Sequence, residues 1–284
     1  MSNAKIGILH PGEMGISVAA SAKNAGNQVY WASAGRGAKS IERASKQGLL
    51  DAGSVAELCA QCSIILSICP PHAAEEIAAE VIATGFKGLY LDGNAISPQR
   101  ALQIGERMAA AGIHFVDGGI IGGPAWKPQS TWLYLSGAKA DEIAACFAAG
   151  PLETKVMGDT IGAASALKMA YAAYTKGSTA LLAASIATAD FWNVRDALAQ
   201  QWDQERAGQA EQNFDRVRKV TAKAWRFVGE MEEIAATFRS AGVPGEFHDA
   251  AATVYQRMAE FKDAAATPNL NDVLQALLDP ERDK

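Results

Sequence analysis

Lys5-Ile6-Gly7-Ile8-Leu9-His10-Pro11-Gly12-Glu13-Met14-Gly15 is the stretch that decides the fold of this chain. It joins a short apolar run to a glycine-bearing turn, and the Ala-rich segment 16–26 beyond it has helical spacing and closes on a glycine. This pattern predicts a strand, a tight turn and a helix. Glycines at such a turn let backbone N–H groups approach a pyrophosphate, whose charge is favoured at a helix N-terminus. We therefore predict a dinucleotide-binding unit whose turn binds the cofactor through Gly12, Glu13, Met14 and Gly15.

How strongly this turn indicates a dinucleotide site depends on the residues around it. His10 occupies the first glycine position of the dinucleotide fingerprint, so the turn alone also fits an ordinary strand-to-helix connection. A second apolar run, 28–32, supports the nucleotide interpretation, and the segment 33–40 after it has no Asp or Glu for the ribose hydroxyls of NAD. Ser33 and Arg36 instead suit the extra phosphate of NADP. We predict NADP rather than NAD, with a solvated surface arginine as the alternative.

Length and composition narrow the class of protein. The chain has 284 residues, of which 49% are hydrophobic and 20% charged, as in ordinary globular proteins, and its net charge is −5. An acidic balance argues against nucleic acid as the main partner. We find no apolar leader with a cleavage site and no run long enough to span a bilayer, so we expect a cytoplasmic protein with no membrane partner.

Cysteine and histidine usage argues against disulfides and metals. Four cysteines are too sparse for a disulfide scaffold, and the pair Cys59 and Cys62 has redox-motif spacing but lies at a helix end that enters a strand. We interpret them as buried structural thiols. The four histidines show no paired ligand spacing, and we predict no metal.

The first part of the chain alternates strands and helices. Strands are predicted at 64–68, 88–92 and 113–117, and helices at 73–84 and 98–111, the latter with Ser97 as N-cap. Ligands of open parallel sheets bind at the carboxyl ends of strands. The turns that would line one crevice are therefore 69–71, 92–95 and 117–124.

The pattern changes near Gly158. Residues 131–137 and 153–157 are predicted as two last strands, and only helical segments come after them. We predict an α/β Rossmann-type dinucleotide-binding domain over 1–157 and an all-helical C-terminal domain over 158–284. The long helix 163–189 is apolar on most faces, which fits either burial inside one chain or a dimer interface.

Lys168 is the candidate catalytic residue. It is a cation in an otherwise small and apolar stretch near the start of that long helix, and Tyr171 and Ala172 share its face by helical spacing. A lysine on a buried face is usable as a proton donor or acceptor. The alternative is a helix-end lysine whose ammonium group reaches solvent.

These motifs together resemble a known family. Gly12-Glu13-Met14-Gly15, the turn 92–98, Asp117 with Gly122-Gly123, and Gly162 six residues before Lys168 are similar to the β-hydroxyacid dehydrogenases related to 6-phosphogluconate dehydrogenase. The segments 223–234 and 241–244 look like the C-terminal domain of a poorly characterised branch of that family.

The resemblance implies roles for particular residues. Lys168 would be the general acid/base, Gly122 and Gly123 would bind the acid group of the substrate, and the C-terminal helices would form a homodimer. Residues implied to lie against the nicotinamide are Cys69, Pro70, Pro71 and Asn94.

Two departures from the family point to a different substrate. Ile121 stands where a serine usually precedes the glycine pair, and Ala172 replaces the asparagine one turn after the lysine. Tyr171 is a candidate replacement for that amide, and Glu230 a further candidate substrate-binding residue. Trp126, Lys127 and Trp225 would shape the pocket, or serve as core aromatics and solvated charges.

The sequence thus predicts an NADP-dependent oxidoreductase that acts on the CH–OH group of a small hydroxy acid or related polar alcohol. Two alternatives stay open. Imine reductases resemble the first domain but generally lack a lysine at position 168. A non-catalytic nucleotide sensor would retain the fold after Ile121 and Ala172 had removed the active site.

Overall fold

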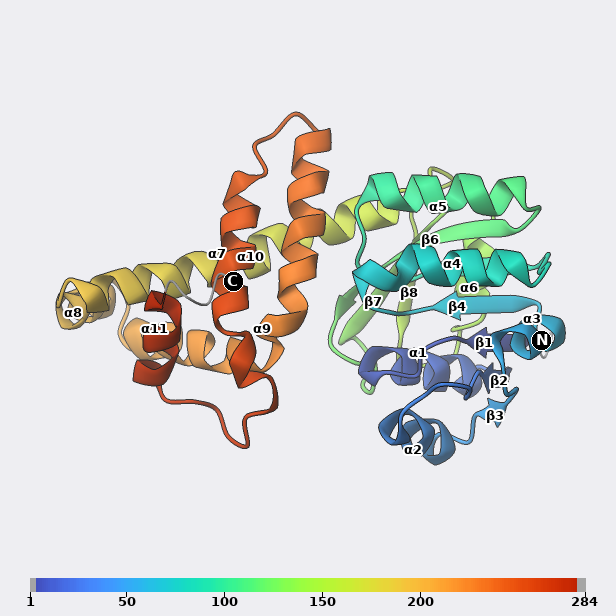
Figure 1. Ribbon diagram of the computed structural model, residues 1–284, viewed down its shortest axis with the longest axis horizontal. Helices are drawn as coiled ribbons and strands as arrows, with labels where there is room; N and C mark the ends of the chain where they lie inside the picture. The colour runs from blue at the N-terminus through green and yellow to red at the C-terminus, as the bar shows by residue number, and fades with distance from the viewer. Residues whose placement is uncertain (1–3, 280–284) are drawn as a thin grey trace. The chain divides into compact units, whose positions relative to one another are not determined.

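The computed structural model in Figure 1 describes residues 4–279. The chain forms two compact units, Met1–Met169 and Ala170–Lys284, which divide within helix α7 (Ala163–Phe191). The predicted domains 1–157 and 158–284 include residues 1–3 and 280–284, which lie outside the described residues. The predicted boundary, between residues 157 and 158, lies before the start of α7. The division of the chain into a cofactor domain and a substrate and dimerisation domain stays a prediction.

The first unit is built on an eight-stranded sheet in the order β3-β2-β1-β4-β5-β6-β7-β8. Strands β6 and β7 pair antiparallel, and every other neighbouring pair is parallel. The strand order reverses between β1 and β4, which is the switch point where doubly wound sheets bind ligands. The strands are β1 (Lys5–Ile8), β2 (Gln28–Trp31), β3 (Leu50–Asp51), β4 (Ile64–Ser67), β5 (Leu89–Asp92), β6 (His114–Gly122), β7 (Thr131–Ser136) and β8 (Glu153–Val156).

Helices cover both faces of this sheet, so the unit has three layers (Figure 1). One core cluster joins the sheet to α1 (Glu13–Asn24), α2 (Ala38–Lys46) and α6 (Ala140–Ala145). The other face packs against α3 (Val55–Gln61), α4 (Ala74–Ala83), which comes after the short turn η1 (Pro71–Ala73), and α5 (Pro98–Ala110).

Local sequence explains how these layers begin. Ser54 and Glu57 form a capping box that starts α3, since each side chain accepts a hydrogen bond from the backbone of the other residue. A Cβ added to Gly7 of β1 would lie 2.8 Å from Leu58 of α3, so the strand glycine lets that helix pack closely. Cys59 and Cys62 are buried at the end of α3, and burial raises the pKa of Cys62 to about 12.

The strand pattern confirms the predicted α/β class, with two corrections. The two-residue strand β3 is too short to leave a hydrophobic signature in the sequence. The predicted turn 117–124 is wrong in its first part, because β6 continues to Gly122 and pairs with β7. Glycines suggested a turn there, but they serve close packing: a Cβ at Gly118 would lie 2.8 Å from Leu91.

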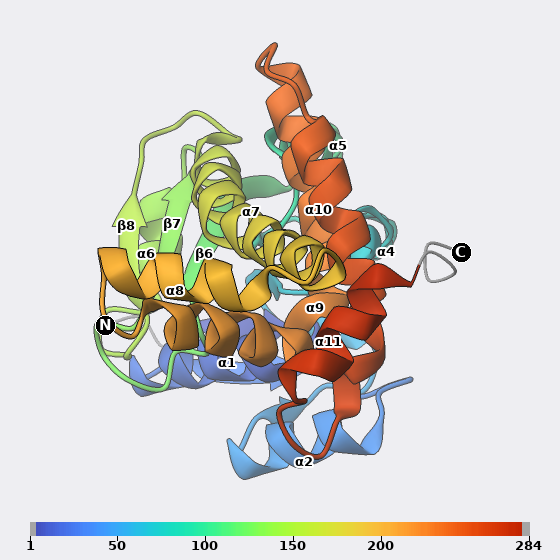
Figure 2. The ribbon, with the colours of Figure 1, turned by 90° about the vertical axis from the view of Figure 1, so that its left-hand side faces the viewer.

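The regular elements of the second unit are all helices within its described residues, 170–279. Figure 2 shows α9 beside α10 and α11, which pack against it. The elements after α7 are α8 (Arg195–Glu205), α9 (Gln209–Ser240), α10 (Glu246–Arg257), η2 (Ala259–Asp263) and α11 (Leu270–Leu278).

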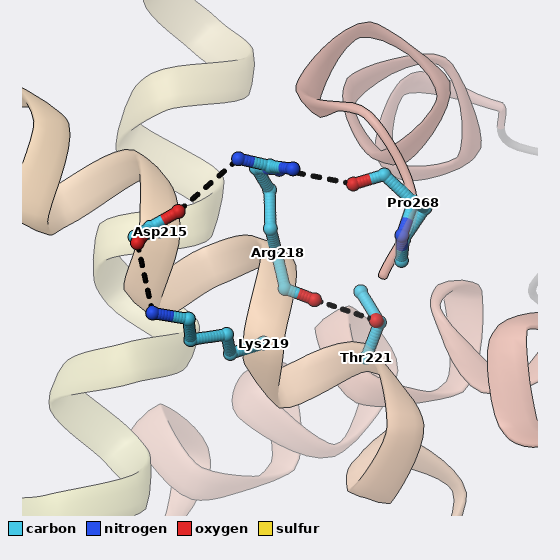
Figure 3. A network of polar contacts seen from close by, with 5 residues as sticks. All are labelled: Asp215, Arg218, Lys219, Thr221 and Pro268. Atoms are coloured by element: carbon cyan, nitrogen blue, oxygen red, sulfur yellow. Dashed lines mark hydrogen bonds and ion pairs between the residues drawn. The ribbon is translucent and has the colours of Figure 1, made fainter. Parts of the chain in front are cut away.

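Arg218 ties α9 to the loop before α11 (Figure 3). Its guanidinium donates one hydrogen bond to the carbonyl oxygen of Pro268 at 3.0 Å and pairs with Asp215 at 3.1 Å. Asp215 also pairs with Lys219, while Thr221 donates its hydroxyl proton to the Arg218 carbonyl oxygen. One arginine therefore fixes both its own helix turn and the approach of α11.

Among residues 4–279, no helix combines the length and apolar character needed to cross a membrane.

Candidate active site

The turn after β1 has the geometry of a phosphate cradle. Gly12 is the N-cap of α1, and a Cβ added to it would meet no atom within 4 Å, so the space in front of the helix end is open. A Cβ at Gly15 would collide with the carbonyl oxygen of His10, so only glycine fits there. Glu13 begins the helix, and the Met14 carbonyl accepts the Ser17 hydroxyl at 2.8 Å. The turn therefore brings the N-terminus of α1, where an anion is favoured, next to open space at Gly12.

The loop after β2 contains the predicted phosphate-recognition residues. The backbone N–H of Arg36 donates to the carbonyl oxygen of Ser33 at 3.0 Å, and Gly35 permits this tight turn through its φ of +73°. Arg36 is half-buried, and within residues 4–279 its Nε has no hydrogen-bond partner.

The ends of β4 and β5 are joined by Asn94. Its side-chain oxygen accepts the Cys69 N–H at 2.6 Å, and its Nδ2 donates to the Ser67 hydroxyl at 3.2 Å. The hydrogen bond from the Cys69 N–H holds the Cys69–Pro71 turn against Asn94. The turns 69–71 and 92–95, which the sequence predicts to line one crevice, therefore lie side by side. Pro70 is exposed, and Pro71 starts η1.

Asp92 lies beneath this network with 1% of its surface exposed. One carboxyl oxygen accepts the Asn94 N–H at 3.0 Å, and the other has no partner among the described residues. Burial raises the pKa of Asp92 from 3.8 to about 7, and the nearby Asp117 carboxylate adds to this effect. Burial likewise raises the pKa of Cys69 to about 12, which makes it a poor nucleophile.

Asp117 at the centre of β6 positions the start of α7. It is 1% exposed, and one of its carboxyl oxygens accepts the N–H groups of Gly162 and Ser165, each at 3.0 Å, and the Ser136 hydroxyl at 3.1 Å. Its other oxygen accepts the Ser165 hydroxyl at 2.6 Å. A carboxylate at a helix N-terminus is favoured both by hydrogen bonding and by the helix dipole.

Lys168 lies one turn after Ser165 and close to β6. A Cβ added to Gly119 would lie 2.5 Å from the carbonyl oxygen of Ala164 and 3.1 Å from Cβ of Lys168. The glycine therefore brings the first turns of α7 onto the strand, and Lys168 itself is half-buried.

The predicted glycine pair ends the same strand. Gly122 has a φ of +123°, a conformation that favours glycine, and the Gly123 carbonyl accepts the Thr131 hydroxyl at 2.6 Å. The loop beyond is held to α1, because Ser17 accepts the Ala125 N–H at 2.9 Å. Next to it lies a cavity of about 380 Å³ between the loop, α1 and α2, lined by Glu13, Ile16, Arg43, Lys46, Gln47, Pro124 and Trp126.

The remaining predicted residues belong to the second unit. Tyr171 is 51% exposed on α7. Glu230 forms an ion pair with Lys176, whose ammonium group also lies 4.2 Å from the ring centre of Phe227. The ammonium group of Lys262 lies over the ring of Trp225, 3.9 Å from the ring centre.

Sequence reasoning missed the polar residues that support the site. Ser17, Ser136 and Ser165 are buried, and each binds a backbone or carboxylate group of another element. The available signal was a serine in an otherwise apolar helix or strand, which must find a hydrogen-bond partner when buried.

The strand order, the glycine turn and the residues at the ends of β1, β2, β4 and β5 define a Rossmann-type dinucleotide-binding protein. Over residues 5–149 the sequence matches the family described as the NAD binding domain of 6-phosphogluconate dehydrogenase. The chain belongs to this family and is an oxidoreductase with a nicotinamide cofactor. Residues 189–258 match a domain of unknown function, DUF1932. No curated protein matches the chain.

Solved structures share the fold over nearly the whole chain. A conserved protein of unknown function, described as structurally similar to 3-hydroxyacid dehydrogenases, is 24% identical with a TM-score of 0.67, over 90% of this chain and 97% of that one. The Mycobacterium tuberculosis 3-hydroxyisobutyrate dehydrogenase, solved with L-serine, is 15% identical with a TM-score of 0.69, over 98% and 100%. The Aspergillus terreus reductive aminase, solved with NADPH and ethyl levulinate, is 17% identical with a TM-score of 0.55, over 96% and 99%.

At these identities the likeness shows the fold and leaves the reaction open. The comparisons confirm the predicted family, with its poorly characterised C-terminal branch, and the predicted Rossmann-type domain succeeded by helices.

Proposed function

We propose that the protein is an NADP-dependent oxidoreductase that transfers a hydride between nicotinamide and a small hydroxy acid or related polar alcohol. Lys168 is its general acid/base. The packing of α7 on β6 at Gly119 is the observation that carries this proposal, because it holds Lys168 against the strand that ends in Gly122.

The residues present fit a dinucleotide. Gly12 opens toward free space at the N-terminus of α1, and Gly15 is sterically required, as a pyrophosphate cradle demands. Arg36 has a buried nitrogen without a partner in the described chain, and a phosphate would satisfy it. Asn94 and the Cys69–Pro71 turn would hold the nicotinamide end. When bound, the nicotinamide supplies or accepts the hydride.

Lys168 handles the proton. In oxidation it takes the proton of the substrate hydroxyl, and in reduction it returns a proton to the carbonyl oxygen. Asp117 supports this role as a positioning residue, because its carboxylate fixes the helix turn that precedes Lys168.

Substrate recognition is proposed from the glycine pair and two residues of the second unit. The backbone N–H groups of Gly122 and Gly123 would bind the acid group. Tyr171 would supply a hydrogen bond in place of the family's amide, and Glu230 would bind a polar group while its partner Lys176 fixes its orientation. The apolar Ile121 and Ala172 would exclude the usual substrates of better-known relatives.

The test is a reduced-cofactor absorbance assay over a panel of hydroxy acids and sugar acids, with NADP and then NAD. Lys168→Met should lower turnover about 100-fold or more while cofactor affinity stays unchanged. The matched control is Lys155→Met, on an exposed position of β8, which should match the wild type. Full turnover in Lys168→Met would remove Lys168 from the mechanism.

A second candidate function is reduction of a C=N bond, which the fold likeness to a reductive aminase favours. The same assay with imines, or with ketones plus amines, separates the two reactions. Tight cofactor binding without turnover in either panel would instead support a nucleotide sensor.

We also propose that the C-terminal helices form a homodimer. Large apolar side chains on α7 and just after it lie at exposed positions, including Tyr174, Leu181 and Trp192, which are 80%, 54% and 69% exposed. Exposed apolar surface of this kind is typical of an association surface. Light scattering of the wild type and of Leu181→Glu tests the proposal, since the variant should shift the mass toward a monomer.

A further inference from the structure

Two buried nitrogen atoms near the cofactor turn have no hydrogen-bond partner among residues 4–279. They are Nδ1 of His10 and Nε of Arg36. Buried polar groups are nearly always hydrogen-bonded, so each exception requires an explanation. A ligand whose oxygen atoms reach both nitrogens would provide it.

Strand pairing brings the two residues to one place. Ile8 of β1 lies opposite Trp31 of β2 in a parallel pair, so His10 and Ser33, each two residues further on, leave the sheet side by side. Arg36 folds back onto that point, because its N–H binds the Ser33 carbonyl oxygen.

The electrostatics agree with this placement. Burial lowers the pKa of His10 from 6.5 to about 4, and the positive charge of Arg36 lowers it further in the same direction. Arg36 is the charged group that acts on His10. Cys69, after β4, also lies within reach of the Arg36 charge, and burial raises its pKa to about 12, while Glu13, three residues after His10, is exposed. Segment 33–40 contributes no carboxylate. His10 is therefore a neutral imidazole beside a fixed cation.

We infer that His10 and Arg36 together bind the 2′-phosphate of NADP, and that His10 takes up one proton from solvent when the phosphate binds. This inference rests on the proposed use of NADP. The phosphate carries up to two negative charges near neutral pH, and Arg36 supplies only one positive charge. Protonation of the imidazole at Nδ1 supplies the second charge and turns the ring nitrogen into a donor toward a phosphate oxygen.

Proton uptake makes cofactor choice depend on pH. NADP should bind more tightly as pH falls toward 6, by at most about tenfold per pH unit for one coupled proton. NAD lacks this phosphate, so its affinity should change little over the same range. The discrimination between the two nucleotides would then be greatest in mildly acidic solution.

The experiment is isothermal titration of the cofactor-free protein with NADP and NAD at pH 6, 7 and 8, in two buffers that differ in ionisation enthalpy. The wild type should take up close to one proton with NADP and none with NAD. His10→Gly restores the fingerprint glycine, so it should keep NAD affinity while it loses about tenfold in NADP affinity and most of the proton uptake. Arg36→Gln should lose at least as much NADP affinity.

Two controls keep the result interpretable. Lys39→Gln removes an exposed cation of the same loop region and should change NADP affinity less than about threefold. His10→Gln retains a polar side chain that cannot take up the proton, and circular dichroism checks the fold of every variant. Equal loss of NAD and NADP in both His10 variants, or unchanged proton uptake in them, would overturn the inference. If neither nucleotide binds the wild type, the proposed function itself fails.

Discussion

The carboxylate of Asp117 should be the strongest single polar contribution to the first unit. Asp117→Ala removes the acceptor of two backbone N–H groups, from Gly162 and Ser165, and of the hydroxyls of Ser136 and Ser165. Each buried donor left without a partner costs about 1–3 kcal/mol. The hydroxyls can rotate to other acceptors, but the N–H groups cannot. The expected loss of unfolding free energy is therefore about 4 kcal/mol.

The substitution Asp117→Asn removes the negative charge of the side chain and keeps its shape. The amide oxygen can still accept the two N–H groups, so the variant loses mainly the charge assistance of these bonds and the favourable interaction with the helix dipole, together about 2 kcal/mol. The matched control is Asp159→Asn, an exposed acidic residue just before the same helix, which should change stability by less than about 0.5 kcal/mol.

Urea unfolding monitored by far-ultraviolet circular dichroism measures all three variants. The order of loss should be alanine, then asparagine, then the Asp159 control. If Asp117→Ala loses less than about 1 kcal/mol, the carboxylate does not hold the helix as we argue. If the asparagine variant loses as much as alanine, charge and not hydrogen bonding dominates.

Three further predictions test packing, titration and loop anchoring. Gly119→Ala should cost about 2–3 kcal/mol because its Cβ would overlap the Ala164 carbonyl, whereas Gly229→Ala, with open space around it, should stabilise α9 by about 0.5–1 kcal/mol in the same urea assay. Because burial raises the folded-state pKa of Asp92 to about 7, wild-type stability should fall as pH rises from about 4 to 7, and Asp92→Asn should abolish this fall when unfolding is compared at pH 5 and 8. Ser17→Ala leaves the Ala125 N–H without its acceptor and should cost about 1–2 kcal/mol, with faster hydrogen exchange in segment 122–130 as the specific readout.

Local patterns predicted the backbone of the first unit well. The glycine turn, the alternation of strands and helices, and the long helix from residue 163 are each encoded within a few neighbouring residues. Asn94 and the turn at Cys69 could be placed together because parallel strands end at one edge. The comparisons confirmed the family that these motifs suggested.

Features that depend on distant contacts could not be predicted in this way. The sequence around Gly118 and Gly119 predicts a turn, because sequence alone does not show that other elements pack closely against these two glycines. The pairing of Glu230 with Lys176 joins residues 54 positions apart, and no periodicity links them. The unpaired nitrogen of His10 likewise results from burial in three dimensions.

The anchoring of α7 by Asp117 has a consequence for the order of folding. The carboxylate lies 45 residues before Gly162 and 48 before Ser165, so the helix start is specified by a distant strand. Contacts of such sequence separation must overcome loop-closure entropy before they stabilise anything. The first turn of α7 should therefore form late, after β6 has joined the sheet, and Asp117→Asn should mainly accelerate unfolding while the folding rate changes little.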